Sequence, residues 1–194
     1  MKTKKERPVD RRIQKTKKGL TEALINLILE KGYEKVTVQD IIDKANVGRS
    51  TFYIHYESKE QLLLDGHNNL NIKIFSDNPA ANGKNKEIDF QNLFAHVGEN
   101  LQLAKAMIGK RSGSMVTDFF RNNIALKVKK KYRGQFRKNK AEEKWLNYLS
   151  DACGAAVISL LISWIDEDMP FSSHEMAEKS TELVNSVFAG LIAG

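Results

Sequence analysis

The chain of 194 residues contains a single cysteine, Cys153, so it cannot form a disulfide within itself. This is typical of proteins that fold in a reducing compartment, and we expect a cytoplasmic location. Cys153 stands among small residues, without a histidine or second cysteine beside it. A buried, inert side chain is therefore a simpler interpretation than a redox-active thiol. Stability must then come from an apolar core, for which this length is sufficient.

Proline is also scarce, at 3 positions, and no stretch alternates polar and apolar residues as strands joined by hairpin turns would. The longest run without a charged residue, 152–165, has 14 residues, whereas a bilayer span needs about 20. The charged N-terminus has no apolar segment behind it, so no signal peptide is expected. We therefore expect an all-α fold with no membrane partner.

The sequence offers no constellation for catalysis or metal binding. The four histidines are scattered, and none has a cysteine or carboxylate at ligand spacing. There is no glycine-rich nucleotide loop, and no nucleophile stands with a base and an orienting group. We therefore predict no enzyme activity, no cofactor and no metal site. An enzyme with a concealed site is the weak alternative, and a substrate-turnover screen would detect it.

Positive charge is concentrated at the start of the chain. The formal net charge is +7, and residues 1–60 hold 14 Lys and Arg against 9 Asp and Glu. A basic arm over 1–10 is suited to phosphate, with a solvated tail as the alternative. A second basic run, 127–144, is better explained as a solvated helix end and loop than as a second nucleic-acid patch.

The segment 36–62, VTVQDIIDKANVGRSTFYIHYESKEQL, predicts two short helices around a turn, with another helix behind them. The two helices are expected at 38–45 and 49–56. A first helix over 10–31, with apolar residues at helical spacing, precedes them and ends at Gly32, a residue suited to a left-handed helix end. This is the arrangement with which a helix-turn-helix presents one helix to the major groove of DNA.

Local signals support these boundaries. Thr37 and Asp40 have the spacing of a capping box at the start of the helix over 38–45. Asn46 tolerates the positive φ that the turn requires. Ser58 and Gln61 repeat the capping signature at the start of the next helix.

Beyond a loop at 76–87, apolar spacing predicts helices at 88–108, 113–134, 141–166 and 173–192. The third of these has apolar residues in nearly every direction, so all of its faces must be buried. The chain has too little material to bury them alone, so we infer a four-helix bundle with a second copy across a two-fold axis. The residues expected at this dimer interface are Trp145, Leu149, Ala152, Ala156, Leu160, Leu183, Val187 and Leu191.

The N-terminal pattern over 13–62 resembles the TetR/AcrR family of bacterial transcriptional regulators. Three positions depart from the family pattern, with Ile42, Asn46 and Gly48 in place of the usual alanine, glycine and serine. The glycine removes a hydroxyl that could cap the following helix. The matching elements are Gly32-Tyr33, Thr37-Val38, Ile41, Ala45, Val47, Thr51-Phe52-Tyr53, His55-Tyr56 and Lys59-Glu60-Gln61-Leu62.

The resemblance implies a DNA-binding domain at 1–60 and a helical domain at 61–194 that dimerises and binds a small effector. Double-stranded DNA with a pseudo-palindromic operator is the implied partner. Tyr53 could instead be a core aromatic, and His55 a surface residue without a role. By the resemblance, Gln39, Arg49 and Ser50 would face base edges, while Thr37, Thr51, Tyr53, His55 and Lys59 would hold phosphates.

The stretch 148–183 resembles the DhaS-like subset of this family. The implied function is a sequence-specific repressor that a small-molecule ligand releases. The alternative is an activator or a DNA-bound, partner-recruiting protein that needs no small ligand. For each candidate for the ligand pocket, plain core is the simpler interpretation; the candidates are His67, Phe75, Phe94, His96, Met107, Phe119 and Phe120.

Overall fold

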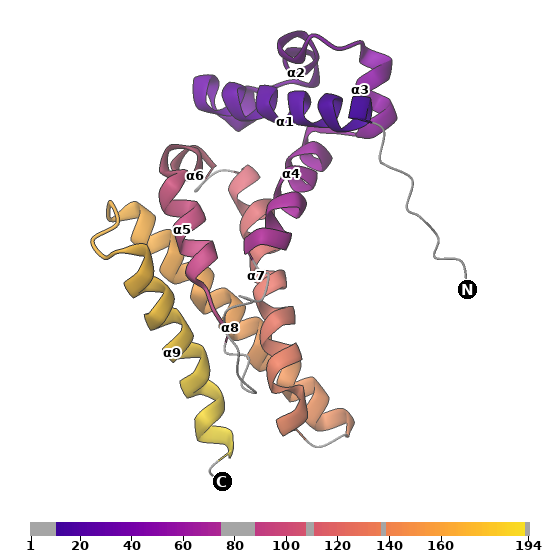
Figure 1. Ribbon diagram of the computed structural model, residues 1–194. Coiled ribbons are helices and arrows are strands. Elements are labelled where there is room, and N and C mark those ends of the chain that lie inside the picture. The colour runs from indigo at the N-terminus through magenta and orange to yellow at the C-terminus, as the bar shows by residue number, and fades with distance from the viewer. Residues whose placement is uncertain (1–10, 75–87, 108–110, 137–138, 193–194) are drawn as a thin grey trace. The chain divides into compact units, whose positions relative to one another are not determined.

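The computed structural model describes residues 11–74, 88–107, 111–136 and 139–192. Within these ranges, no side chain is described at 67–74, 111–113 and 190–192. The described residues are helical nearly throughout and contain no strand, which confirms the predicted all-α fold (Figure 1). The chain divides into two compact units, residues 1–67 and residues 68–194. The predicted basic arm at 1–10 and Phe75 lie outside the described residues.

The first unit is a small helical domain with one apolar core. Its helix over 38–45 has the predicted bounds, and the following helix ends at His55, one residue before the predicted end. Its elements are α1 (Arg11–Lys31), the 3-10 turn η1 (Tyr33–Lys35), α2 (Val38–Ala45), α3 (Arg49–His55) and the start of α4 (Lys59–Ile74). The fully buried side chains of its core include Leu20, Leu24, Ile28, Ile41, Phe52 and Leu62.

Two turn signals in this unit are confirmed, and a third is confirmed in its position. Thr37 and Asp40 form the predicted capping box at the start of α2. Asn46, at the end of α2, has φ 51° and ψ 51°, which is the left-handed conformation expected of the turn. Gly32 directly follows the end of α1, as predicted, and has a positive φ of 75°, but its ψ of 147° differs from the left-handed helical conformation that was expected. Its N–H donates to the carbonyl of Ile28 at 2.8 Å.

The second unit is made of longer helices. The helices expected at 141–166 and 173–192 each begin within one residue of the predicted start, and α7 begins two residues before the predicted 113. The elements of this unit beyond α4 are α5 (Gln91–Glu99), α6 (Leu101–Met107), α7 (Arg111–Tyr132), the 3-10 turn η2 (Arg133–Gln135), α8 (Lys140–Asp166) and α9 (Ser173–Ile192).

The single helix predicted over 88–108 is wrong, because the chain breaks at Asn100 into α5 and α6. The side-chain amide of Asn100 donates to the carbonyl of His96 at 2.8 Å, and its backbone N–H reaches the carbonyls of both His96 and Val97 at 3.1 Å. An asparagine that bonds its own neighbouring backbone competes with the helical ladder and favours a helix end.

Helices α7 and α8 pack very closely, and Gly154 is the residue that permits it. A Cβ built on Gly154 would lie 2.6 Å from the carbonyl oxygen of Arg121 on α7. The buried face of α8 includes Leu146, Val157 and Ile165. The chain after α8 turns back through Phe171, whose carbonyl accepts the indole N–H of Trp164 at 2.8 Å.

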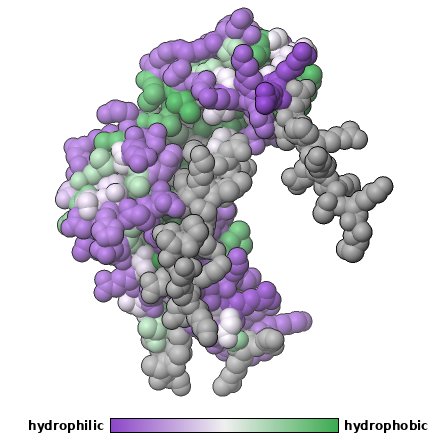
Figure 2. Space-filling view, in the orientation of Figure 1, coloured by the Kyte–Doolittle hydropathy of each residue, from purple (hydrophilic) through white to green (hydrophobic). Residues whose placement is uncertain are grey.

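Among the described helices, α8 is the one long and apolar enough to pass, by length and composition, as a membrane span. One face of α8 is buried, and α8 packs mainly against α7. Hydrophilic residues also cover most of the described surface visible in Figure 2. The opposite face of α8 is exposed, with Trp145 at 49% and Tyr148 at 53% of their free surface.

Candidate nucleic-acid interface

Helix α3 is held by one face and presents the other to solvent. Phe52 is fully buried, whereas Arg49, Ser50 and Tyr53 are exposed. Gly48 precedes the helix as its N-cap and supplies no side-chain hydrogen bond, as expected from the missing hydroxyl. A short helix anchored on a single aromatic residue therefore offers polar and aromatic groups outward, as a recognition helix does.

Arg49 and Tyr53 lie one helical turn apart and interact. The guanidinium of Arg49 lies over the Tyr53 ring, 5.8 Å from its centroid. Tyr53 in turn packs edge-on against Phe52, with ring centroids 5.3 Å apart. This stacking orients the guanidinium along the outward face, and the planar group retains donors for a bidentate contact with a guanine edge.

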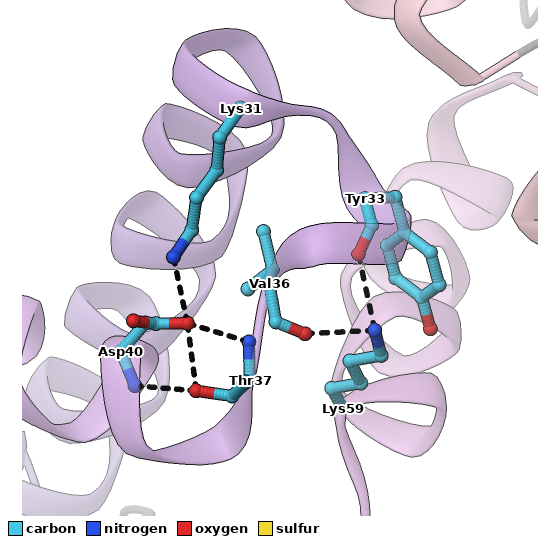
Figure 3. A network of polar contacts seen from close by, with 6 residues as sticks. All are labelled: Lys31, Tyr33, Val36, Thr37, Asp40 and Lys59. Atoms are coloured by element: carbon cyan, nitrogen blue, oxygen red, sulfur yellow. Dashed lines mark hydrogen bonds and ion pairs between the residues drawn. The ribbon is translucent and has the colours of Figure 1, made fainter.

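The start of α2 is fixed by a network around Asp40, shown in Figure 3. Its carboxylate accepts from the backbone N–H of Thr37 at 2.7 Å and from the Thr37 hydroxyl at 2.6 Å. The ammonium of Lys31 pairs with the same oxygen at 2.8 Å. The Lys31 and Thr37 side chains therefore hold the pKa of Asp40 well below its usual range. The network presents Thr37 and α2 in one defined orientation.

Lys59 lies at the start of α4 and points back to the turn before α2 (Figure 3). Its ammonium donates to the carbonyls of Tyr33 at 3.0 Å and Val36 at 2.8 Å, and lies 4.2 Å from the centroid of the Tyr33 ring. An ammonium has three N–H donors, so one remains for a further acceptor. The sequence pattern predicts a phosphate contact for Lys59 and did not indicate these contacts with the protein itself.

Two carboxylates of α4 hold its first two turns against the same unit. Asp65 accepts from the hydroxyl of Tyr56 at 2.7 Å and from the ammonium of Lys17 at 3.1 Å. Glu60 accepts from the hydroxyl of Tyr33 at 3.0 Å. Burial and these hydrogen bonds raise the pKa of both phenols. We call Lys59, Glu60 and Asp65 the α4 clamp, because together they contact α1, η1 and the end of α3.

The predicted DNA-contacting residues lie at the start of α2, on α3 and at the start of α4. Thr37 and Gln39 are exposed, and the Gln39 amide donates to Asp43 at 2.8 Å. Thr51 and His55 are partly buried. Within α3, one exposed residue was absent from the predicted set: Ile54, which a helical projection places opposite Phe52.

In the second unit, none of the predicted dimer-interface side chains that are described is buried. Trp145, Ala152 and Leu183 are exposed. The side chain of Leu191 lies outside the described residues. The remaining four are partly buried: Leu149, Ala156, Leu160 and Val187.

The residues predicted for a ligand pocket divide into core and partly exposed positions. Phe94, Met107 and Phe120 are buried, and Phe94 packs edge-on against Trp164 with centroids 5.5 Å apart. Phe119 is partly buried. The side chain of His67 lies outside the described residues.

His96, the remaining pocket candidate, is partly buried at the end of α5. Burial lowers the pKa of its imidazole, against the opposing charge of Glu99. Its ring nitrogen lies 3.3 Å from the Asn100 amide. Within the described residues, no group of three or more His, Cys, Asp and Glu is placed to hold a metal ion.

A shallow groove of about 250 Å³ lies between α7 and α8. None of the predicted pocket residues lines it. Its charged pair, Asp118 and Arg121, is joined at 3.1 Å. The remaining lining residues are small or apolar: Thr117, Ala155, Ile158, Ser159, Ile162 and Ser163.

Known proteins match both units. Residues 20–65 match a family described as bacterial regulatory proteins, tetR family, and residues 85–186 match a transcriptional regulator C-terminal region. The uncharacterized HTH-type transcriptional regulator YxbF of Bacillus subtilis (strain 168) is 43% identical over 60 residues, or 30% of this chain. That stretch is 16% of YxbF, so the chain spans a small part of that relative's length.

Two solved structures share the fold over nearly the whole chain. A TetR transcriptional regulator from Streptococcus agalactiae 2603V has 26% identity and a TM-score of 0.61, over 90% of this chain and 96% of that one. The dihydroxyacetone kinase operon activator DhaS has 21% identity and a TM-score of 0.57, over 90% and 95%. Members of the matched family are transcriptional regulators and not enzymes. The chain belongs to the tetR family of bacterial regulatory proteins.

Proposed function

We propose that the protein is a cytoplasmic homodimer that binds a pseudo-palindromic operator and represses transcription until a small ligand releases it. Residues 1–60 act as the DNA-binding domain and residues 61–194 as the domain for dimerisation and effector binding. Each subunit places one α3 in the major groove of a half-site. The observation that supports this best is the outward face of α3, where Arg49, Ser50 and Tyr53 stand exposed around a helix anchored by Phe52.

The predicted contacts fall into two classes. Gln39, Arg49 and Ser50 recognise base edges, because a guanidinium or amide can bond two atoms of a purine edge at once. The second class holds backbone phosphates and sets the register without selecting a sequence. Its members are Thr37, Thr51, Tyr53, His55 and Lys59. The Lys59 ammonium donates two of its three N–H groups to backbone carbonyls and would use the third for the phosphate.

Dimerisation uses the exposed face of α8 together with one face of α9. A two-fold interface brings the same patch of each subunit together. Trp145 of α8 and Leu183 of α9 are large apolar side chains in solvent. The small Ala152 and Ala156 of α8 would allow a close helix approach. Four helices, two from each subunit, form the bundle.

The effector binds one of two conformations of the dimer more tightly than the other. The difference between its two binding affinities limits how much it can change the affinity for the operator. His96 and Phe119 are the described pocket candidates that are not fully enclosed. A protein that activates transcription, or recruits a partner without a ligand, is the alternative. Reporter expression with and without the gene for this protein distinguishes repression from activation.

The test of the proposal is Arg49→Ala, with the operator first selected by wild-type protein from random duplexes. We expect specific binding to weaken by about 1–3 kcal/mol and one base position to become degenerate, while binding to random DNA changes little. Arg133→Ala, in the second unit, is the matched control. An equal loss on operator and random DNA would contradict the base contact. Wild-type protein that selects no sequence would refute the proposal.

A further inference from the structure

Ile54 is unusually exposed for its side chain. Its relative exposure is 76%, the highest among the large hydrophobic residues in the described part of the chain. The next, Leu126 of α7, reaches 65%. Burial of an aliphatic side chain is favourable, so an isoleucine as exposed as this one would gain free energy by packing against an apolar partner.

The position of Ile54 on α3 defines where that partner lies. At about 100° per residue, Ile54 is roughly 200° around the helix from the buried Phe52, so it points away from the core. It is one helical turn beyond Ser50, so the two share a stripe. Arg49 and Tyr53, stacked on each other, form the neighbouring stripe. Ile54 is thus on the same outward face as the proposed base-reading side chains.

The chemistry of the major groove leaves few partners for an aliphatic side chain. Phosphates and most base edges present hydrogen-bond donors and acceptors, and isoleucine can satisfy none of them. The apolar group on a base edge in this groove is the C5 methyl of thymine. Carbon atoms of deoxyribose, along the backbone, are the other apolar surface.

We propose that Ile54 is a specificity-determining residue that packs on the C5 methyl of one thymine in each half-site. The inference rests on the proposed function, because it requires α3 to enter the major groove. It adds a requirement that hydrogen-bonding groups alone do not impose: a thymine at a fixed position, selected by its methyl group. Arg49 and Ser50 select the neighbouring bases independently.

The experiment removes the methyl group and the side chain separately and together. Duplexes selected by wild-type protein are prepared with each thymine replaced in turn by deoxyuridine, which lacks only the methyl. We expect one position per half-site at which this change weakens wild-type binding by about three- to fivefold. Ile54→Ala should bind more weakly and show no further loss at that position. Ile54→Val, which retains most of the side chain, should remain partly sensitive.

Leu126→Ala is the matched control, because it truncates an exposed aliphatic side chain in the second unit. It should keep the full methyl sensitivity of the wild type. Equal methyl sensitivity in wild type and in both Ile54 variants would overturn the inference alone, and would assign Ile54 to the sugar surface. The inference would also be overturned if the wild-type protein bound equally well after each thymine was replaced by deoxyuridine. Wild-type protein that selects no duplex would overturn the proposed function, and this inference with it.

Discussion

Helices α3 and α8 both leave large apolar side chains in solvent, but they are built differently. Helix α3 has 7 residues and one buried anchor, Phe52. Helix α8 has 27 residues, with a complete buried face along its length. A short helix on one anchor relies on its flanking turns for orientation. A long helix with a buried face is oriented by its own packing.

The neighbours of the exposed residues also differ. Around Ile54 and Tyr53 of α3 stand Arg49 and the polar Ser50. On α8, Trp145 shares its exposed face with Tyr148 and, further along the helix, with the small residues Ala152 and Ala155. Exposed apolar groups among basic and polar side chains suit the mixed surface of DNA. Exposed apolar groups among alanines suit another helix, because small residues allow close approach.

The largest effect is expected from a charge on the exposed face of α8, where we propose that the second subunit packs. Ala155 is exposed within one chain, so Ala155→Glu should leave each chain folded. In the dimer the two carboxylates would be buried without a partner, which weakens association by about 3 kcal/mol or more. Analytical ultracentrifugation and circular dichroism measure association and folding separately.

The matched variant places the same charge on α3. Ser50→Glu should abolish DNA binding through repulsion by phosphate while leaving the dimer intact. An Ala155→Glu protein that is still dimeric and still binds the operator would contradict the proposal that α8 forms the dimer interface.

A smaller effect should follow from Gly154→Ala. Alanine favours a helix over glycine by about 1 kcal/mol, but here the added Cβ would lie 2.6 Å from a backbone oxygen of α7. Separating the two helices costs about 1–3 kcal/mol, so we expect net destabilisation in chemical denaturation. Gly19→Ala in α1 is the control, since nothing lies within 4 Å of its added Cβ, and it should stabilise the protein. Equal stabilisation by both changes would contradict the close α7–α8 packing.

The smallest effect concerns pH and the turn that orients α2. The pKa of Asp40 is lower in the folded than in the unfolded chain, so its charged form stabilises the fold. That contribution is complete above about pH 4 and is lost as pH falls through the folded pKa. Asp40→Asn should therefore be less stable than wild type at neutral pH and converge with it in acid. Lys31→Met should reproduce part of this change; a stability difference independent of pH would exclude the charge as its cause.

Local signals in the sequence predicted the first unit well. The capping box at Thr37 and the left-handed Asn46 depend on a few neighbouring residues, so the turn could be located without knowing the fold. The break at Asn100 was missed because apolar spacing continues across it, and the asparagine's bond to the carbonyl of His96 interrupts only the backbone. Ile54 has no hydrogen-bonding group, so the family pattern assigns it no DNA contact, although a helical projection places it on the outer face.

Contacts between distant segments could not be predicted in this way. The bonds from Lys59 to the carbonyls of Tyr33 and Val36 join residues 26 and 23 positions apart. Lysine in the family pattern indicates a phosphate contact and gives no sign that carbonyls occupy two of its donors. The Asp65 carboxylate likewise serves two partners that meet only after α1 and α3 have packed.

The α4 clamp has a practical consequence for dissecting the protein. A fragment cut at residue 60 would retain every proposed DNA contact but lose Asp65, and with it the carboxylate that joins Tyr56 to Lys17. Such a fragment should melt at a lower temperature than one cut after Gly66, although none of the six added residues is a proposed DNA contact. The smallest fragment that folds alone and binds the operator should therefore include the first two turns of α4, a helix that continues into the other unit.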